Sequence, residues 1–208
     1  MPEGPEIRRA ADEIAAVLVG QRIEQVSFAL PALRRYSPLL SGCSVTHLET
    51  RGKALLTHFD NDYTIYSHNQ LYGVWKTAQR GRLPKTNRSL RLALHTATHS
   101  ALLYSASDIS VWPSEDLVQH PFLKAIGPDL LSPELSWRDI ESRLQESRFA
   151  GRALGALYLD QHFLAGVGNY LRSEILFVAG LDPQCRLGDA DDARLRERHD
   201  LGRFQRHQ

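Results

Sequence analysis

The sequence has few cysteines: Cys43 and Cys185 are the only two among 208 residues, and neither belongs to a C-x-x-C pair. A disulfide framework or a four-cysteine zinc site needs more thiols than this, so both are excluded within the chain. No apolar run approaches the length of a membrane span, and the acidic start MPEGPE lacks the basic and apolar regions of a signal peptide. We therefore expect a soluble cytosolic protein.

Acidic residues are missing from Tyr63 to Ser107, although the net charge of the whole chain is only +1. The same stretch holds six basic residues: Lys76, Arg80, Arg82, Lys85, Arg88 and Arg91. Aromatic side chains stand among them, and a second arginine-rich stretch, diluted by acids, runs from 186 to 206. This combination favours a polyanionic partner such as nucleic acid, while a solvated basic face explains the charge alone equally well.

Hydrophobic periodicity divides the chain into a β-rich first part and a helical second part. A helix is predicted near residues 5–19, because apolar residues recur there at helical spacing. Short strands are then expected at 22–28, 44–49, 53–59, 63–68, 89–96 and 101–105, and helices at 116–124, at 135–147 and within 151–181. The predicted fold class is α+β: an N-terminal antiparallel β-sandwich with a leading helix (1–126), followed by a helical domain (127–208).

The first six residues place two prolines and two glutamates ahead of the leading helix. If Met1 is removed, Pro2 becomes a free secondary amine; α-amino groups titrate at about 7.7–8.0, so much of it would be nucleophilic and able to form an iminium. Glu3 and Glu6 are three residues apart, on one helical face, where one can donate a proton and the other can position it. Proline and acids are also ordinary signals of a helix start, and from this stretch alone that explanation is preferred.

Two glycine-containing stretches carry further candidates. In TRGKALL, Lys53 follows Gly52 at the start of a hairpin strand, from which it can reach a phosphate or a sugar; an exposed strand lysine is the commoner explanation. In LAGVGNYLRSEIL, the turn through Gly168 delivers backbone amides to a helix start, where Asn169 can cap the helix or bind a phosphate oxygen. Close helix packing alone would also account for these glycines.

The stretch SHNQLYGVW places Gln70, Leu71 and Tyr72 in a loop between strands. An amide, an aliphatic wedge and an aromatic ring can together fill a gap in a base stack, although a plain surface loop is the default interpretation. The nine histidines are scattered without metal-ligand spacing, so no metal site is assigned.

Taken in order, these stretches resemble the Fpg/Nei family of DNA glycosylase/AP lyases, and within it the endonuclease VIII (Nei) branch. The matching motifs are MPEGPEIRRAAD, ETRGKALLTHF, YSHNQLYGVW, LLYSASDI, HPFL…GPD and LDQHFLAGVGNYLRSEIL. They cover nearly everything up to about Leu181. The resemblance implies a helix-two-turn-helix fold for the second domain, and oxidised pyrimidines rather than 8-oxoguanine as the favoured bases.

The resemblance also implies catalytic roles. Pro2 would attack C1′ of a damaged nucleotide flipped out of the duplex, and β,δ-elimination through the iminium would cut the strand on both sides of the lost sugar. Glu3 would protonate the sugar ring oxygen, and Glu6 would support the helix start. Lys53 would serve proton transfer and phosphate contact.

DNA-binding roles follow from the same resemblance. Gln70, Leu71 and Tyr72 would plug the vacated base stack, and the turn at Gly168 and Asn169 would grip a backbone phosphate. The implied partner is double-stranded DNA containing oxidised pyrimidines or abasic sites, bound by a monomer in the cytoplasm, at the nucleoid, without membrane contact.

The chain departs from the family pattern in two places. The branch commonly has a basic residue two positions before the linker glycine; here Ala125 stands there, and we expect neighbouring Lys124 to make that phosphate contact. The family usually ends in a four-cysteine zinc finger, whose ligands this sequence lacks. We therefore expect a truncated or frame-shifted product, or a chain lacking its last module, without a metal cofactor and with weakened DNA binding.

Three functions remain open on the sequence alone. The first is the bifunctional glycosylase/lyase, with lyase action on abasic sites as its less demanding part. The second is a lesion-binding module without turnover. The third, more remote, is an N-terminal-proline enzyme of the tautomerase kind, whose chains are far shorter and lack the helix-two-turn-helix segment.

Overall fold

The computed structural model describes residues 1–186 and consists of two compact units that divide between Lys124 and Ala125. The arginine-rich tail and the predicted truncated end of the second domain fall largely outside the described residues. The domain boundary expected between residues 126 and 127 stays a prediction. Within residues 1–186, no helix is long and apolar enough to cross a bilayer.

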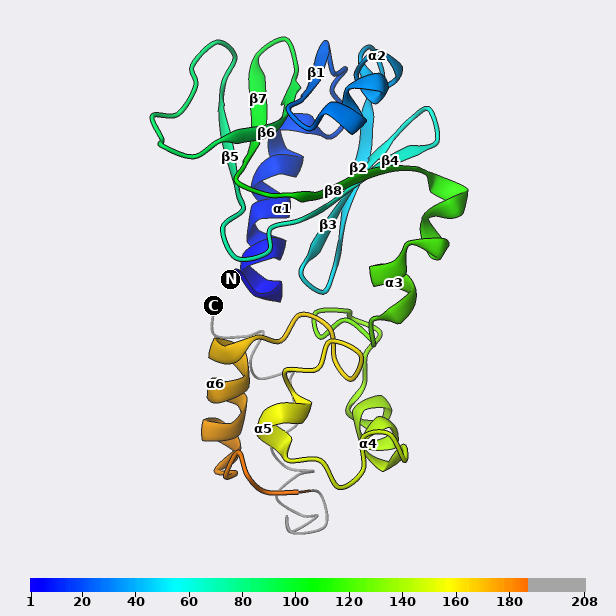
Figure 1. Ribbon diagram of the computed structural model, residues 1–208, viewed down its shortest axis with the longest axis vertical. Helices are drawn as coiled ribbons and strands as arrows, with labels where there is room; N and C mark the ends of the chain where they lie inside the picture. The colour runs from blue at the N-terminus through cyan, green and yellow to red at the C-terminus, as the bar shows by residue number, and fades with distance from the viewer. Residues whose placement is uncertain (187–208) are drawn as a thin grey trace. The chain divides into compact units, whose positions relative to one another are not determined.

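Unit 1 is built on two four-stranded antiparallel sheets (Figure 1). One sheet has the strand order β1-β6-β7-β5 and the other the order β2-β3-β4-β8. The strands are β1 (Gln25–Phe28), β2 (Val45–Arg51), β3 (Ala54–Phe59), β4 (Tyr63–His68), β5 (Val74–Gln79), β6 (Leu90–His95), β7 (His99–Tyr104) and β8 (Asp108–Pro113). The predicted α+β class with an antiparallel sandwich is therefore confirmed.

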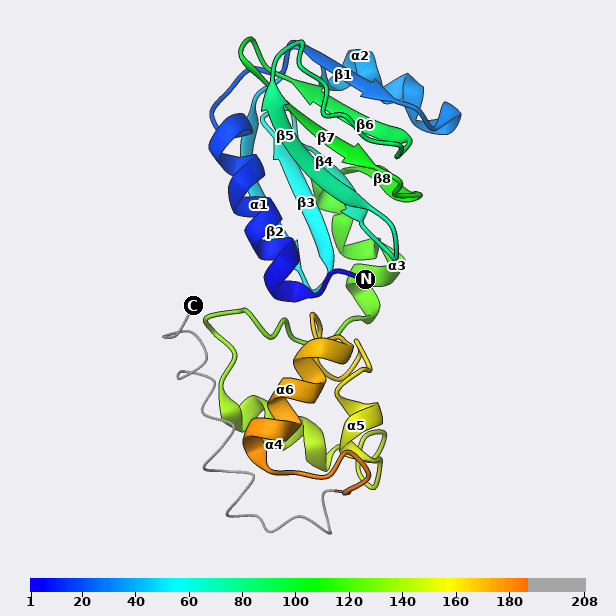
Figure 2. The ribbon, with the colours of Figure 1, turned by 90° about the vertical axis from the view of Figure 1, so that its left-hand side faces the viewer.

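The leading helix α1 (Gly4–Leu18) buries one apolar face in the core of unit 1. Ile7, Ala11, Ile14 and Leu18 lie on this face, and each is at most 4% exposed. They belong to one hydrophobic cluster with residues of both sheets, and α1 runs along β2 and β5 (Figure 2). The buried apolar face of α1 thus holds the amino-terminal residues against the sandwich.

Two strands were not predicted from the sequence. β5 and β8 are edge strands of their sheets, and β8 ends at Pro113, which lacks a donor for a further ladder bond. In β5 only Trp75 is buried, so the stretch lacks the continuous run of buried residues found in the central strands β3 and β4. The pairing of β5 with β7 and of β8 with β4 joins segments distant in sequence.

The helix expected at 116–124 is wrong as one element. The chain instead forms the 3-10 helix η2 (Ser114–Gln119) and then α3 (Pro121–Ala125), with His120 between them at ψ 125°. The ring of Pro121 clashes with a helical conformation of the preceding residue, so the helix must restart at the proline. Two other short helices, η1 (Pro31–Tyr36) and α2 (Ser37–Leu40), follow β1.

Unit 2 contains α4 (Trp137–Gln145), α5 (Leu154–Leu157) and α6 (Asn169–Ala179). Ser136 and Asp139 cap α4 reciprocally, with Ser136 N–H donating to Asp139 Oδ2 at 2.8 Å. In its core, Phe163 meets Phe149 and Tyr158 edge-on, with ring centroids 5.2 Å and 5.7 Å apart. The helical stretch expected within 151–181 is thus two helices, and residues 158–168 join them.

Candidate active site and DNA-binding elements

The amino-terminal residues form a helix start whose two glutamates occupy different environments. Glu3 is the N-cap of α1 and is only 7% exposed, whereas Glu6 is exposed. The Glu6 carboxylate accepts a hydrogen bond from the Glu3 N–H at 2.6 Å, as in a capping box. Glu6 is therefore engaged with the helix start, and Glu3 is the buried carboxyl group beside Pro2.

Pro2 is half-buried, while Met1 is 61% exposed. The Pro2 nitrogen lies in a peptide bond with Met1, so its nucleophilicity depends on removal of that residue. An exposed first residue is accessible to an aminopeptidase. The geometry is thus compatible with processing to a free proline amine.

Lys53 lies in the two-residue turn of the β2–β3 hairpin, because Arg51 pairs with Ala54 across it. Gly52 adopts φ +61°, in the left-handed region that such turns require. Lys53 itself is only 8% exposed, so the alternative of an exposed strand lysine is wrong. Burial lowers the pKa of Lys53, and the Glu3 carboxylate partly opposes this by favouring the ammonium form.

Glu3 and Lys53 are both buried and close enough to interact electrostatically, so they form one site within unit 1. A lysine with a lowered pKa releases its proton more easily than an exposed one, and a buried carboxyl group can transfer a proton away from bulk water. Together with an amine at Pro2, the pair provides a nucleophile and two proton-transfer groups. Such a set suits attack on an aldehyde-like carbon.

Residues 69–73, named here the wedge loop, connect β4 to β5 and present Leu71 and Tyr72 to solvent. Leu71 is 56% exposed and Tyr72 is 67% exposed, so two large side chains face solvent next to each other in this loop. The loop is closed by Gly73 N–H, which donates to Asn69 O at 2.7 Å. A Cβ at position 73 would lie 2.4 Å from that oxygen, so only glycine fits.

Further hydrogen bonds hold the wedge loop. Gln70 has φ +51°, a strained conformation for a residue with a Cβ, and its Oε1 accepts a bond from Ser107 Oγ at 2.7 Å. Arg88, from the acid-free basic stretch, donates to Tyr72 O. The exposed apolar tip therefore rests on a loop whose backbone is fixed.

In unit 2, the turn before α6 places Gly168 at the N-cap and Asn169 at the first helical position. Asn169 is exposed and does not cap α6, so that alternative is wrong; its role as a phosphate ligand stays a prediction. The buried turn backbone is held by Gln161, whose Nε2 donates to Val167 O at 2.8 Å and to Leu159 O at 3.1 Å. Its Oε1 accepts from Gly166 N–H at 3.1 Å.

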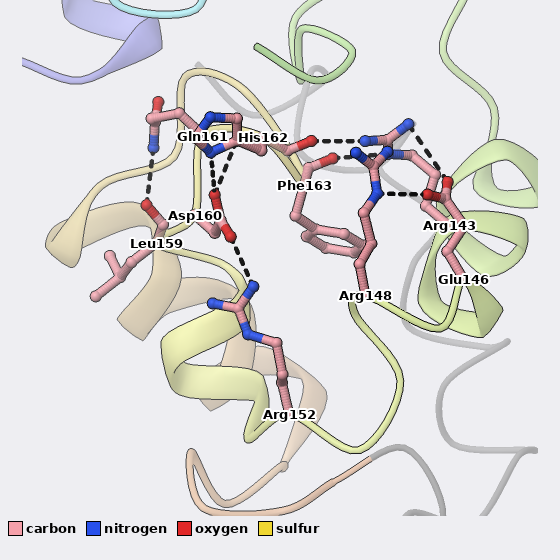
Figure 3. Close-up of polar contacts among 9 residues, drawn as sticks. All are labelled: Arg143, Glu146, Arg148, Arg152, Leu159, Asp160, Gln161, His162 and Phe163. Carbon is pink, nitrogen blue, oxygen red and sulfur yellow. Dashed lines mark hydrogen bonds and ion pairs between the residues drawn. The ribbon is translucent and has the colours of Figure 1, made fainter. Parts of the chain in front are cut away.

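Asp160 fixes the other side of this turn (Figure 3). Its carboxylate accepts bonds from Arg152 Nη1 at 2.6 Å, from His162 N–H at 2.9 Å and from His162 Nδ1 at 2.8 Å. Burial by itself raises the pKa of Asp160, but these donors outweigh burial and lower the pKa to about 2. Arg143 adds bonds to the carbonyl oxygens of His162 and Phe163. Side chains thus satisfy several backbone groups of the turn, and backbone bonds satisfy others, such as Ala165 N–H to Pro128 O at 2.9 Å.

The remaining predicted DNA contact, Lys124, is exposed in α3. Among residues 1–186, no three His, Cys, Asp or Glu side chains converge to hold a metal ion. The two cysteines of the chain cannot supply four thiolates, so its residues do not fit the structural zinc that the resemblance implies.

Comparison with known proteins decides the family. The formamidopyrimidine-DNA glycosylase N-terminal domain matches residues 1–107. Endonuclease 8 of Escherichia coli O1:K1 is 53% identical over 195 residues, which are 94% of this chain and 74% of that protein. The chain belongs to the formamidopyrimidine-DNA glycosylase (Fpg/Nei) family. Endonuclease 8 of Escherichia coli O139:H28 has the same identity and coverage.

Solved structures of the family share the fold at lower identity. Lactococcus lactis Fpg (MutM), in a complex with DNA containing N7-benzyl-Fapy-dG, has a TM-score of 0.81 at 19% identity, covering 96% of this chain and 75% of its own. The same protein in a complex with abasic-site DNA also reaches a TM-score of 0.81 at 19% identity, covering 95% and 74% of the two chains. The family fold therefore extends well beyond the matched N-terminal domain.

Three residues that support the site were not predicted from the sequence. Gln161 and Ser107 were not assigned, although each hydrogen-bonds to a predicted DNA-binding segment. His68 was also left out, although it immediately precedes the wedge loop. The only available sequence signal was their proximity to the quoted motifs, because their partners depend on loop geometry.

Proposed function

We propose that this protein is a base-excision repair enzyme: a DNA N-glycosylase for oxidised pyrimidines and an AP lyase that acts through the amine of Pro2. The observation that carries the proposal is the buried, electrostatically coupled pair of Glu3 and Lys53 beside the proline-bearing start of α1. The 53% identity to endonuclease 8 supports the same activity. The fold shared with an Fpg bound to lesion-containing and abasic DNA supports double-stranded DNA as the partner.

The reaction follows from the groups present. The Pro2 nitrogen attacks C1′ of the flipped nucleotide, the C1′–N bond to the base breaks, and the base leaves with the electron pair of that bond. The proton of the attacking nitrogen passes to the Glu3 carboxylate. Glu3 donates its proton to the ring oxygen O4′, which opens the sugar and leaves an iminium at C1′. Because the iminium accepts electrons, loss of a C2′ proton expels the 3′ phosphate, and a second elimination expels the 5′ phosphate.

Lys53 has a lowered pKa and is placed to move protons during these steps, in either its ammonium or its amine form. Burial of Glu3 and Lys53 keeps proton transfer away from bulk water. Gln70, Leu71 and Tyr72 fill the gap in the stack, and the Gly168–Asn169 turn and Lys124 contact phosphates. We place the enzyme on nucleoid DNA in the cytoplasm, acting as a monomer.

Borohydride trapping tests the proposal. The purified chain is incubated with an abasic-site duplex and, separately, with a thymine-glycol duplex, and sodium borohydride reduces any iminium to a stable covalent adduct. We expect an adduct with both duplexes, and loss of both adducts in Pro2→Gly. Intact mass measured on the same sample should show that Met1 is absent.

Each other outcome contradicts part of the proposal. Binding to both duplexes without any adduct would indicate a lesion-binding module without turnover. An adduct with the abasic duplex alone would restrict the activity to the lyase. Persistence of Met1 in a preparation that still forms adducts would exclude Pro2 as the nucleophile.

A further inference from the structure

We propose that His68 is a positioning residue that holds the wedge loop in its DNA-competent shape by accepting a hydrogen bond from Gln70. The proposal deepens the proposed function, since it assigns the residue that prepares the loop for insertion into the base stack. The bond joins His68 Nδ1 to the Gln70 backbone N–H at 2.9 Å. His68 is the last residue of β4, so the ring is fixed to the sheet and the bond reaches into the loop.

Strand register places His68 between β3 and β8. It pairs with Ala54, next to Lys53, on one side and with Asp108 of β8 on the other. The ring also packs edge-on against Phe122, with centroids 5.4 Å apart. The central sheet position and this contact restrict the ring, so its hydrogen bond has a defined direction.

The loop needs such a restraint because Gln70 is held at φ +51°. A residue with a Cβ persists in this region only where its surroundings compensate the strain. The N–H bond to His68 and the side-chain bond from Ser107 restrain Gln70 from two sides. Leu71 and Tyr72 follow directly and are exposed, so the backbone conformation of Gln70 helps to set their direction.

The bond requires an unprotonated Nδ1, because an imidazolium has no acceptor. Burial lowers the pKa of His68 below its ordinary value of 6.5, and the Lys53 ammonium lowers it further, while the Asp108 carboxylate raises it. Tyr66, on the same strand, donates a hydrogen bond from its hydroxyl to Asp108 Oδ2 at 3.4 Å, so this carboxylate is already engaged. At neutral pH the ring is therefore an acceptor, and acidification releases the loop.

Two variants at one position separate this bond from other uses of the ring. In His68→Asn, the amide oxygen stands where Nδ1 was and can accept the same bond, but it does not titrate. In His68→Leu, the acceptor is lost and the volume is largely kept. The first readout is the fluorescence of a duplex with 2-aminopurine opposite a stable abasic analogue, which reports insertion into the stack. The second, run in parallel, is borohydride trapping on an abasic duplex.

We expect His68→Leu to lower the insertion rate about tenfold at pH 7.5, as loss of one hydrogen bond that orders a loop allows, and His68→Asn to stay within about threefold of the original chain. Because the pKa of His68 is lowered, insertion by the original chain should weaken only when the pH falls well below the ordinary imidazole value, and that loss should be absent in His68→Asn. Equal insertion by His68→Leu and the original chain overturns the proposal. So does a loss in His68→Asn as large as in His68→Leu, since the ring would then act through another atom.

The two readouts keep the two proposals apart. Fluorescence reports the loop and needs no covalent chemistry, whereas trapping reports the amine. If no chain forms an adduct but the fluorescence pattern is as expected, the proposed lyase fails and the role of His68 stands. If adducts form and all three chains insert alike, the role of His68 fails and the lyase stands.

Discussion

The start of α1 with the β2–β3 turn and the turn before α6 use side chains in opposite ways. At the first region, the side chains of Glu3 and Lys53 are buried, and we propose that they carry the chemistry themselves. At the second, the side chains of Asp160 and Gln161 are engaged with backbone groups of their own turn. What that turn offers a partner is its backbone and the exposed Asn169.

The two arrangements therefore have opposite effects on the stability of the folded protein. Burying Lys53 is unfavourable for its charged form, so a side chain proposed to be reactive lowers the stability of the folded protein in the first region. The second region gains stability, because donors from Arg152 and His162 stabilise the Asp160 carboxylate. We therefore expect substitutions in the first region to change rates without unfolding the protein, and substitutions in the second to change stability and affinity.

Lys53→Met should have the largest effect. The substitution keeps the apolar length of the side chain but removes proton transfer, so the rate of base excision should fall about a hundredfold or more. The urea midpoint should stay the same or rise, because a buried cation is replaced by an apolar group. Single-turnover kinetics and urea unfolding at pH 7.5 check both expectations.

Lys85→Met is the matched control, since Lys85 is an exposed lysine of the basic stretch. It removes the same charge and should leave the single-turnover rate at saturating enzyme nearly unchanged. If both variants lose rate equally, long-range charge rather than the site explains the effect. If Lys53→Met unfolds the protein, the contrast between the two regions is lost.

Asp160→Asn should reduce stability by about 2 kcal/mol at pH 7, given a carboxyl pKa lowered from 3.8 to about 2. The sign follows from the depressed pKa: the stabilisation is complete above about pH 4 and is lost as the pH falls toward 2. Urea unfolding at pH 7 and at pH 3 should therefore show a smaller gap between the two proteins at the lower pH.

Asp12→Asn provides the comparison for that result. Asp12 forms an ion pair with Arg8 at 3.2 Å, but both side chains are mostly exposed, at 67% and 58%. Its loss should change stability by less than about 0.5 kcal/mol, as for other exposed helix pairs. Equal losses in the two variants would remove the distinction drawn for Asp160.

Gln161→Met should have the smallest effect of the three, a loss of about tenfold in affinity for an abasic-analogue duplex. The variant leaves the backbone groups of residues 159, 166 and 167 without their side-chain partner, so the turn loses its fixed shape. Fluorescence anisotropy across a range of salt concentrations checks this, with Gln184→Met at an exposed position as control. An unchanged affinity would show that the turn does not contribute to DNA binding.

The sequence was sufficient for the parts of the fold with strong periodicity or turn signals. The α1 periodicity, the central strands and the Gly52 turn are confirmed because short-range preferences decide them. β5 and β8 were not predicted, although β8 alternates buried and partly buried residues and β5 buries Trp75. The break at His120 follows from Pro121, a sequence signal that conflicts with the single helix expected at 116–124.

Candidate site residues divide in the same way. Glu3 and Lys53 were named because reactive side chains are visible as residue types, but the burial that tunes them is not. Gln161 and His68 were missed because their importance lies in which backbone groups they reach. Those contacts exist only once the loops have folded.

Mass-spectrometric mapping of the reduced adduct addresses the central chemistry most directly. After borohydride trapping on an abasic duplex, nuclease and trypsin digestion should leave the sugar remnant on the peptide spanning residues 2–8, attached to the nitrogen of Pro2. A remnant on the peptide that contains Lys53, with residues 2–8 unmodified, would make that lysine the nucleophile and contradict the account.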